Sequence, residues 1–250
     1  MTPILDAGLR VSSLRTLLVA VVLLSVPLAA SGTVPGIPEL PVSTVSAIAD
    51  PVVAVAAEPR PVSTDVLELA FNAASCAVRA GSVQAPATLT VIDYSKPSTE
   101  KRLWVFDMRT RAVLYEELVA HGMGTGDNLA SAFSNEPDSH KTSLGLFVTE
   151  GTYVGKNGYS LRLNGLDEGF NDRARERAIV MHGAPYVSEA FAQTQGRLGR
   201  SWGCPALREA VARQVIDTVK GGNLVFAYYP DAQWLKASQY LGDCAAAAAR

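Results

Sequence analysis

The chain has 250 residues, a formal net charge of −2, 48% apolar residues and only 18% charged residues. This length suffices for one large domain or two small ones, and the apolar fraction excludes a wholly disordered or collagen-like chain. A protein that binds nucleic acid through phosphate contacts normally has an excess of basic residues, so we expect no nucleic-acid partner.

The N-terminus has the pattern of an export signal. Arg10 and Arg15 come before an apolar run that extends from Leu17 to Ala30 and ends in small residues. This order is typical of a cleaved secretory signal, and the run is shorter than the ~20 residues needed to cross a bilayer. We predict a signal peptide at residues 1–31, a mature protein without a membrane span, and a location in the periplasm or cell envelope; a retained anchor is the alternative.

The aromatic residues show where the folded domain lies. All 7 Phe, 8 Tyr and 3 Trp occur at or after Phe71, and such rings build hydrophobic cores. Residues 32–61 are rich in Pro, Ala and Val and predict an extended linker. Residues 241–250 read as a low-complexity tail. The folded domain is therefore expected over residues 62–240.

Within that domain, β patterns outnumber helical ones. A helical pattern follows Pro61 and ends before Gly81, and a second is expected over 206–219. We expect strands over 87–94, 102–108, 113–119, 145–149, 153–154, 159–163, 178–181 and 224–229. Asn157-Gly158 predicts a hairpin turn. The pattern favours a mostly β fold with packed helices (α+β), closed into a barrel or sandwich.

One connection, over residues 120–144, is unusually long. It contains His121 and His140 together with several glycines. Loops of this length in compact domains are generally functional or disordered. Its composition suits a lid or a substrate-binding edge, and a mobile insertion is the alternative.

Of the three cysteines, Cys204 is the best candidate nucleophile. It follows Gly203 and precedes Pro205, which favours the first position of a helix, so we expect the thiol at a helix N-terminus with a lowered pKa. The backbone N–H groups of Gly203 and Cys204 could then bind an oxyanion. Cys76 reads as a buried residue and Cys244 as part of the tail, and an oxidising compartment would allow these two to form a disulfide.

His182 is the best candidate base. It ends an expected buried strand and is followed by Gly183, which suits a side chain that faces a cleft. His121 and His140, in the long connection, are weaker candidates. The sequence contains no H-x-x-x-H, H-x-H or C-x-x-C pattern, so no metal site is expected.

These residues match a known family pattern. His182-Gly183 is followed after 17 residues by S-W-G-C (201–204), and T-S-L-G-L-F (142–147) lies upstream. The sequence from about 89 to 229 resembles the YkuD-like L,D-transpeptidases of bacterial cell walls, in particular the murein L,D-transpeptidase catalytic-domain family. Its strings L-x-V-x-D, G-Y-S-L-R-L-N-G and R-A-I-V-M-H-G-A carry the likeness together with S-x-G-C.

The resemblance implies a cysteine acyltransferase with an L,D-transpeptidase fold that acts on peptidoglycan stem peptides. Cys204 would form a thioester with release of D-alanine, His182 would be the base, the Gly183 carbonyl would orient His182, and an amine would accept the acyl group. No metal or nucleotide cofactor is implied. An L,D-carboxypeptidase or hydrolase of stem peptides or wall-bound protein is one alternative, and a non-catalytic wall-binding module is another. Nothing in the sequence indicates an oligomeric state.

The sequence departs from the family pattern at two positions. Trp202 stands where the family has the histidine of S-H-G-C, and Ala206 stands where it has an arginine two residues after the cysteine. A substrate carboxylate must then be bound by another cation, with Arg197, Arg200 and Arg208 as candidates. We expect the following residues to contact the substrate: Ser201, Trp202, Arg200, His121 and Tyr159.

Overall fold

The structure is a computed structural model and describes residues 62–242. The expected signal peptide, the linker and Cys244 lie outside the described residues, so these expectations stay predictions. Within residues 62–242 no helix is both long and apolar enough to cross a membrane.

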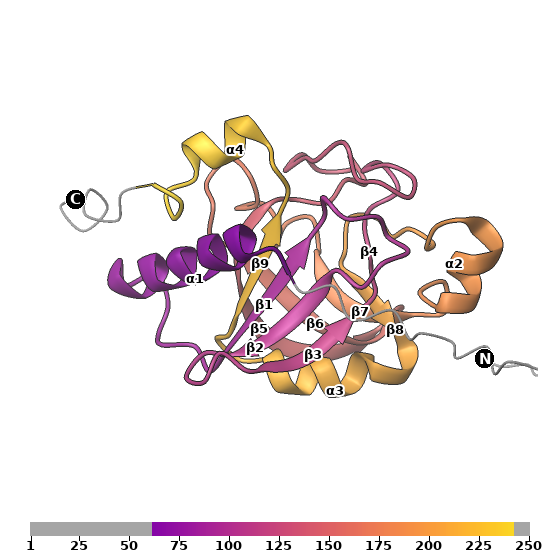
Figure 1. Cartoon of the computed structure of the whole chain (residues 1–250), viewed down its shortest axis with the longest axis horizontal. Coiled ribbons are helices and arrows are strands. Elements are labelled where there is room, and N and C mark those ends of the chain that lie inside the picture. The colour runs from indigo at the N-terminus through magenta and orange to yellow at the C-terminus, as the bar shows by residue number, and fades with distance from the viewer. Residues whose placement is uncertain (1–61, 243–250) are drawn as a thin grey trace, which may run out of the picture. The chain divides into compact units, whose positions relative to one another are not determined.

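A nine-stranded mixed sheet in the order β3-β2-β1-β9-β5-β6-β7-β8-β4 forms the framework (Figure 1). Its strands are β1 Thr88–Asp93, β2 Leu103–Asp107, β3 Val113–Glu117, β4 Val119–Ala120, β5 Gly145–Gly155, β6 Gly158–Gly165, β7 Val180–Ala184, β8 Ala206–Arg208 and β9 Leu224–Tyr228. The helices are α1 Thr64–Arg79, α2 Glu189–Gln195, α3 Glu209–Val219 and α4 Ala232–Ala237. The β1–β9 and β7–β8 pairs are parallel, and the other pairs are antiparallel.

The sheet curls until it is nearly a closed barrel. Its two edge strands, β3 and β4, are consecutive in the chain and are separated by Leu118 alone. One residue spans less than 4 Å, so the two edges of the sheet must lie next to each other. This confirms the expected mostly β fold with packed helices.

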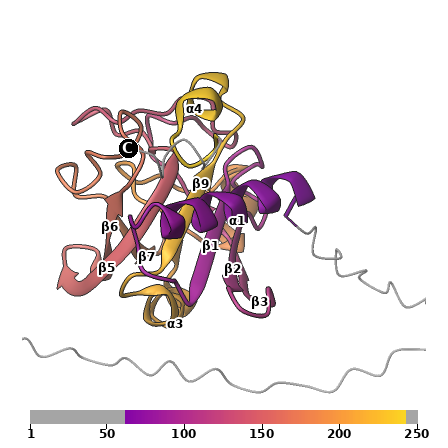
Figure 2. The same ribbon diagram turned by 90° about the vertical axis from the view of Figure 1, so that its left-hand side faces the viewer.

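Helix α1 covers the outer face of β1 and β9 (Figure 2). Its buried face carries small side chains, which let the helix axis approach the strands closely: Ala70, Ala73, Ala74 and Ala77. They pack with Leu89 and Val91 of β1 and Phe226 of β9 in one apolar cluster. The helix expected after Pro61 is thus confirmed, and it ends before Gly81, whose φ is +71°.

Helix α3 fills the inner face of the curled sheet. Val215, Ile216 and Val219 are fully buried and share a cluster with Ile92 of β1 and Val225 of β9. Successive residues of a strand point to opposite faces, and β1 and β9 are buried on both sides. β9 is accordingly apolar or aromatic throughout, whereas β1 also buries Thr88, Thr90 and Asp93.

The helix expected over 206–219 begins later than predicted. Residues Ala206–Arg208 form β8, which pairs in parallel with β7 and antiparallel with β4, and α3 starts at Glu209. Pairing on both sides satisfies the backbone polar groups of this segment, and this outweighs the tendency of Pro205 to start a helix. Cys204 therefore precedes a strand and does not cap a helix.

The remaining differences concern lengths and short helices. β5 continues without a break through the segment that was expected as two strands, and β7 extends past His182 to Ala184. At the hairpin, Gly155 pairs with Gly158, so the two residues of the turn are Lys156 and Asn157. Helices α2 and α4, which the sequence analysis missed, span only 7 and 6 residues.

The loop between β6 and β7 folds back onto the sheet. The buried Asp167 carboxylate accepts a hydrogen bond from the Leu146 N–H at 2.7 Å, and burial raises the pKa of this carboxyl group. The Asn171 side chain bonds both Asp167 N–H and the Leu146 carbonyl. Gly165, at the end of β6, lies directly against the Asn171 backbone.

We predict that Gly165→Ala destabilises the fold. A Cβ at this position would overlap the Asn171 carbonyl, so the backbone must shift, and such overpacking costs about 1–3 kcal/mol of unfolding free energy. Gly151→Ala is the matched control, since no heavy atom lies within 4 Å of its added Cβ. Urea unfolding of both variants measures the difference; equal stabilities would contradict this packing.

Candidate active site

A pocket of about 630 Å³ opens between the β5–β6 hairpin, β7 and the loop that ends at Cys204. Its lining residues are Tyr153, Lys156, Asn157, Arg177, Ala178, Val180, His182, Tyr186, Arg200, Ser201, Trp202 and Cys204. The structure therefore brings the expected nucleophile and the expected base into one cavity.

The Cys204 thiol sits against the start of β7. The Val180 N–H points at Sγ over 3.5 Å, and the Ala178 carbonyl oxygen is 3.9 Å from Sγ. Ala178 itself has a φ of +53°, a left-handed conformation that costs energy for a residue with a side chain. The turn at Ala178 leads the chain into β7 beside the thiol.

The pKa of Cys204 is raised, against the expectation of a lowered value. The side chain is buried, and burial disfavours the thiolate. The Val180 N–H and the charge of Arg177 act in the opposite direction but are the smaller effects. The expected helix N-terminus is absent at this position because β8 lies between Cys204 and α3.

His182 lies in the middle of β7. Its Nδ1 is 2.9 Å from the carbonyl oxygen of Gly183, and because a carbonyl only accepts, Nδ1 carries the proton and Nε2 keeps its lone pair. His182 and Val180 are two residues apart on one strand, so they share the face that meets Cys204.

Burial shifts the pKa values of both His182 and Cys204 toward their neutral forms. It lowers the pKa of His182 and raises the pKa of Cys204. Both shifts disfavour the charged forms, so the cavity that Cys204 and His182 line favours a neutral thiol and a neutral imidazole. Such an imidazole can act as a general base when a substrate arrives.

The turn before the nucleophile is fixed by Ser201. Its hydroxyl donates to the Cys204 carbonyl at 2.6 Å and accepts from the Gly203 N–H at 3.1 Å. The Gly203 N–H expected to bind an oxyanion is thus occupied. The Cys204 N–H has no hydrogen-bond acceptor among the described residues, which leaves it available.

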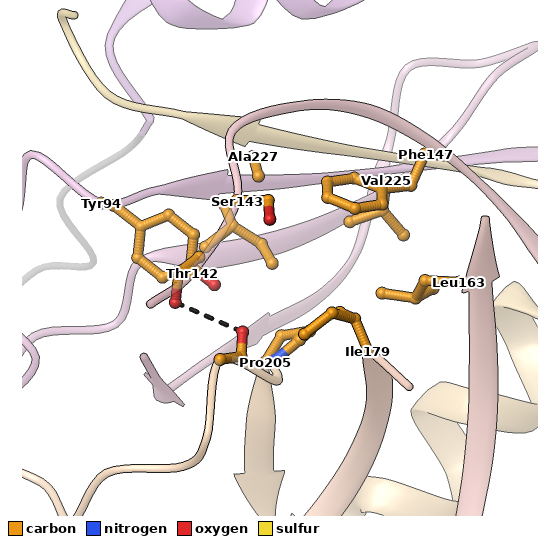
Figure 3. Close-up of a pocket in the computed structure, with 11 residues that line it drawn as sticks. Tyr94, Thr142, Ser143, Phe147, Leu163, Ile179, Pro205, Val225 and Ala227 are labelled. Carbon is orange, nitrogen blue, oxygen red and sulfur yellow. Dashed lines mark hydrogen bonds between the residues drawn. The ribbon is translucent and has the colours of Figure 1, made fainter. Parts of the chain in front are cut away.

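Behind this turn lies a small cavity of about 10 Å³, between Thr142, Phe147, Leu163 and Ile179, which is at most large enough for one water molecule (Figure 3). The Thr142 hydroxyl donates to the Gly203 carbonyl at 3.3 Å. The large pocket, which Cys204 itself lines, is the route by which we expect a substrate to reach the thiol.

Arg177 is a pocket residue that the sequence analysis missed. Its guanidinium donates to the carbonyl oxygens of Ser134 at 2.8 Å and Lys141 at 2.6 Å and to the hydroxyl of Ser143. It thereby ties the long connection to the wall of the pocket. The arginine precedes an expected buried strand, but nothing in its spacing from Cys204 indicated that the two would meet.

Of the three arginines expected to bind a substrate carboxylate, only Arg200 lines the pocket, and it is bonded to Asp127 at 2.8 Å. Arg208 makes a two-pronged ion pair with Glu117, with both bonds at 2.8 Å. Arg197 donates to the Leu198 carbonyl at 2.9 Å and lies outside the lining.

The other expected substrate contacts divide into two groups. Ser201 and Trp202 line the pocket; the Trp202 ring is 71% exposed and stacks on His140 with a centroid distance of 4.8 Å. Tyr159 lies outside the lining because its hydroxyl bonds Asp217 of α3 at 2.7 Å.

His121 is also outside the pocket, which corrects its expected role. It is 1% exposed, its Nδ1 lies 2.8 Å from a guanidinium nitrogen of Arg102, and its Nε2 lies 3.2 Å from the Gly126 carbonyl. Arg102 is itself fully buried and donates twice to the Val119 carbonyl. The long connection is therefore packed on the barrel, and within residues 121–144 no side chain lines the large pocket.

We predict that His121 makes stability depend on pH. Burial and the charge of Arg102 lower its pKa from 6.5 to about 4. As pH falls below 6.5, His121 becomes protonated in the unfolded chain but stays neutral in the folded chain. The free energy of unfolding therefore decreases, by up to about 3 kcal/mol for this group. His182 contributes with the same sign because its pKa is also lowered.

The measurement is the unfolding free energy between pH 8 and pH 5 for the wild type and His121→Gln. The variant is expected to lose less stability over this range, while its value at pH 8 gives the cost of the substitution itself. Parallel curves for the two proteins would contradict the assignment.

Within residues 62–242 no group of three or more His, Cys, Asp or Glu side chains is arranged to hold a metal ion. The expected disulfide between Cys76 and Cys244 stays a prediction, because Cys244 lies outside the described residues.

A family model describes most of this chain: residues 58–228 match the L,D-transpeptidase catalytic domain (YkuD_2). No curated protein matches the sequence. Among solved structures, an L,D-transpeptidase from Mycobacterium smegmatis is 16% identical, with 57% of this chain and 59% of that chain covered and a TM-score of 0.36. An L,D-transpeptidase from Stackebrandtia nassauensis is 17% identical, with 63% and 66% covered and a TM-score of 0.36.

The helical cell shape determining protein Pgp2 from Campylobacter jejuni is 11% identical, with 64% of this chain and 57% of that chain covered and a TM-score of 0.39. The match to the first of these structures spans about three-fifths of its length.

Proposed function

Because the chain belongs to the family of L,D-transpeptidase catalytic domains, we propose that it is a cysteine acyltransferase acting on peptidoglycan stem peptides. One observation carries the proposal. Cys204 and His182 line the same pocket, and the Gly183 carbonyl holds His182 in the tautomer that a base requires. The cell envelope, where peptidoglycan lies, is the proposed place of action, and residues 1–31 are the proposed export signal.

In the first step His182 Nε2 takes the Cys204 proton as Sγ attacks the carbonyl carbon that precedes the terminal D-alanine. A C–S bond forms, and the carbonyl oxygen becomes an oxyanion that the free N–H of Cys204 can bind. Collapse of this intermediate breaks the C–N bond, and D-alanine leaves with the proton held by His182. A thioester on Cys204 remains.

In the second step an acceptor resolves the thioester. The amine of another stem peptide attacks the thioester carbon while His182 accepts its proton; a C–N bond forms, the C–S bond breaks, and His182 returns the proton to the Cys204 thiolate, which leaves a crosslink. Water in the same role gives a shortened stem peptide. The two outcomes share every residue of the site, and an assay with both acceptors present gives their ratio. A predominance of the hydrolysed product would identify the protein as an L,D-carboxypeptidase or hydrolase.

Arg177 supports this chemistry from the wall of the pocket. Its guanidinium lies within 3.3 Å of the point that a Cβ on Gly203 would occupy, so the absence of a side chain at Gly203 lets a positive charge approach the nucleophile's turn. The same charge lowers the pKa of Cys204 in opposition to burial. Arg177 is thus proposed as a positioning residue for the Cys204 turn.

We predict that Cys204→Ala abolishes acylation. The wild type incubated with a carbapenem is expected to gain the mass of the drug, because family members accept these compounds as acylating analogues, and the variant is expected to gain none. Cys76→Ala is the matched control and should still gain the adduct, since Cys76 packs in α1 and lies outside the pocket. An adduct on Cys204→Ala would overturn the nucleophile, and no adduct on a folded wild type would favour a non-catalytic binding module.

We predict that His182→Ala costs nearly as much acylation rate as Cys204→Ala at pH 7, because nucleophile and base act as one unit. The loss should shrink at higher pH, where the thiol ionises without a base. Because burial raises the pKa of Cys204, this recovery is expected only above the ordinary thiol range of ~8.5. The acylation rate as a function of pH measures it; a wild-type rate at pH 7 would exclude His182 as the base.

A further inference from the structure

The large pocket carries a positive charge that no lining carboxylate opposes. Its described lining residues include Lys156, Arg177 and Arg200 but no Asp or Glu. The chain as a whole has a net charge of −2, so this concentration of cations is local. A cleft lined by one sign of charge attracts ligands of the other sign.

The three cations differ in what already binds them. Arg177 donates to backbone carbonyls and hydroxyls that hold it in place, and Arg200 is paired with the Asp127 carboxylate at 2.8 Å. None of the ion pairs or hydrogen bonds within residues 62–242 involves the side chain of Lys156. Its ammonium group is the cation of the pocket that is left for a ligand.

The β5–β6 hairpin fixes the backbone position of Lys156. β5 and β6 pair from Phe147–Gly165 to Gly155–Gly158, and Lys156 occupies the two-residue turn at the tip. A register shift between Thr149 and Thr152 interrupts this ladder, and bulges of this kind increase twist and bend a hairpin. Lys156 and Asn157 at the tip, with Tyr153 below them, form one wall of the pocket.

The segment that follows Cys204 adds no cation to the pocket, because Ala206 is fully buried in β8 and carries no polar group. Arg177 and Arg200 line the pocket but are already bonded to protein groups. A carboxylate of the donor peptide that reaches the hairpin side of the pocket would meet the unpaired ammonium group of Lys156.

We propose that Lys156 makes the site selective for donor stem peptides with a free carboxylate beside the scissile bond, over donors in which that carboxylate is a primary amide. This inference rests on the proposed function. An amide has the same shape but no charge, so it forfeits the attraction of the ammonium group. Lys156 is exposed, and exposed ion pairs are worth about 0.2–1 kcal/mol, so the expected selectivity due to Lys156 is about 1.4- to five-fold in kcat/KM.

The experiment uses the protein with three synthetic tetrapeptide donors ending in diaminopimelyl-D-alanine. One has free carboxylates, one has the terminal carboxyl as an amide, and one has the free diaminopimelate carboxyl as an amide. Release of D-alanine or D-alaninamide gives kcat/KM for the wild type, Lys156→Gln, Lys156→Arg and Lys236→Gln. The last is the matched control, because it makes the same charge change on α4, outside the pocket lining.

The wild type is expected to have a higher kcat/KM for the donor with free carboxylates than for at least one amidated donor. Lys156→Gln is expected to lose this preference, because the substitution lowers kcat/KM for the donor with free carboxylates and leaves the amidated donors unchanged. Lys156→Arg and Lys236→Gln should keep it, and 0.5 M salt should weaken it. The inference is overturned if the wild type shows no preference, or if Lys156→Gln slows all donors equally, while the donors still acylate Cys204. If no donor acylates Cys204, the proposed function fails and the inference with it.

Discussion

The parallel pairing of β8 with β7 is the constraint on which the site depends. Only three residues, Ala206–Arg208, make this pairing, and it sets the segment just before them beside Val180 and His182. The same pairing buries the Cys204 thiol and directs the Val180 N–H toward it. It also displaces the start of α3 to Glu209, so the surroundings of Cys204, the proposed nucleophile, are those of a sheet and not of a helix terminus. Burial therefore governs its protonation.

Two arginines without a salt bridge organise the long connection between β4 and β5. Arg102 is fully buried and fixes one end of it through Val119 and His121, and Arg177 fixes the other end through Ser134 and Lys141. A buried guanidinium is tolerated when its donors are satisfied, and the backbone carbonyls of an irregular segment provide suitable acceptors. The connection packs behind the Cys204 turn, where the Thr142 hydroxyl donates to the Gly203 carbonyl.

The sequence predicted the strands well because β1, β2 and β9 combine β-branched and aromatic residues with clear turns. Cys204 and His182 could be recognised because each stands beside glycine in a short motif. The start of α3 was wrong because Pro205 favours a helix locally, while pairing of β8 with two strands is a tertiary effect. Lys156 and Arg177 were missed for a related reason. The local sequence around a lysine or arginine does not indicate which pocket the side chain will line, and only the fold brings a hairpin tip and a loop to the pocket of Cys204.

Burial of Cys204 also bears on how long the proposed nucleophile would stay reactive in the proposed envelope compartment. Thiolates, and not thiols, react with oxidants and with disulfides, and a compartment outside the cytoplasm offers both. A nucleophile with a permanently lowered pKa would there be converted to sulfenic acid or a mixed disulfide between turnovers. Cys204 is only 8% exposed, and burial holds its proton in place. On the proposed mechanism the thiol would lose its proton to His182 as it attacks a carbonyl group, so burial would protect it from oxidation until a substrate arrives.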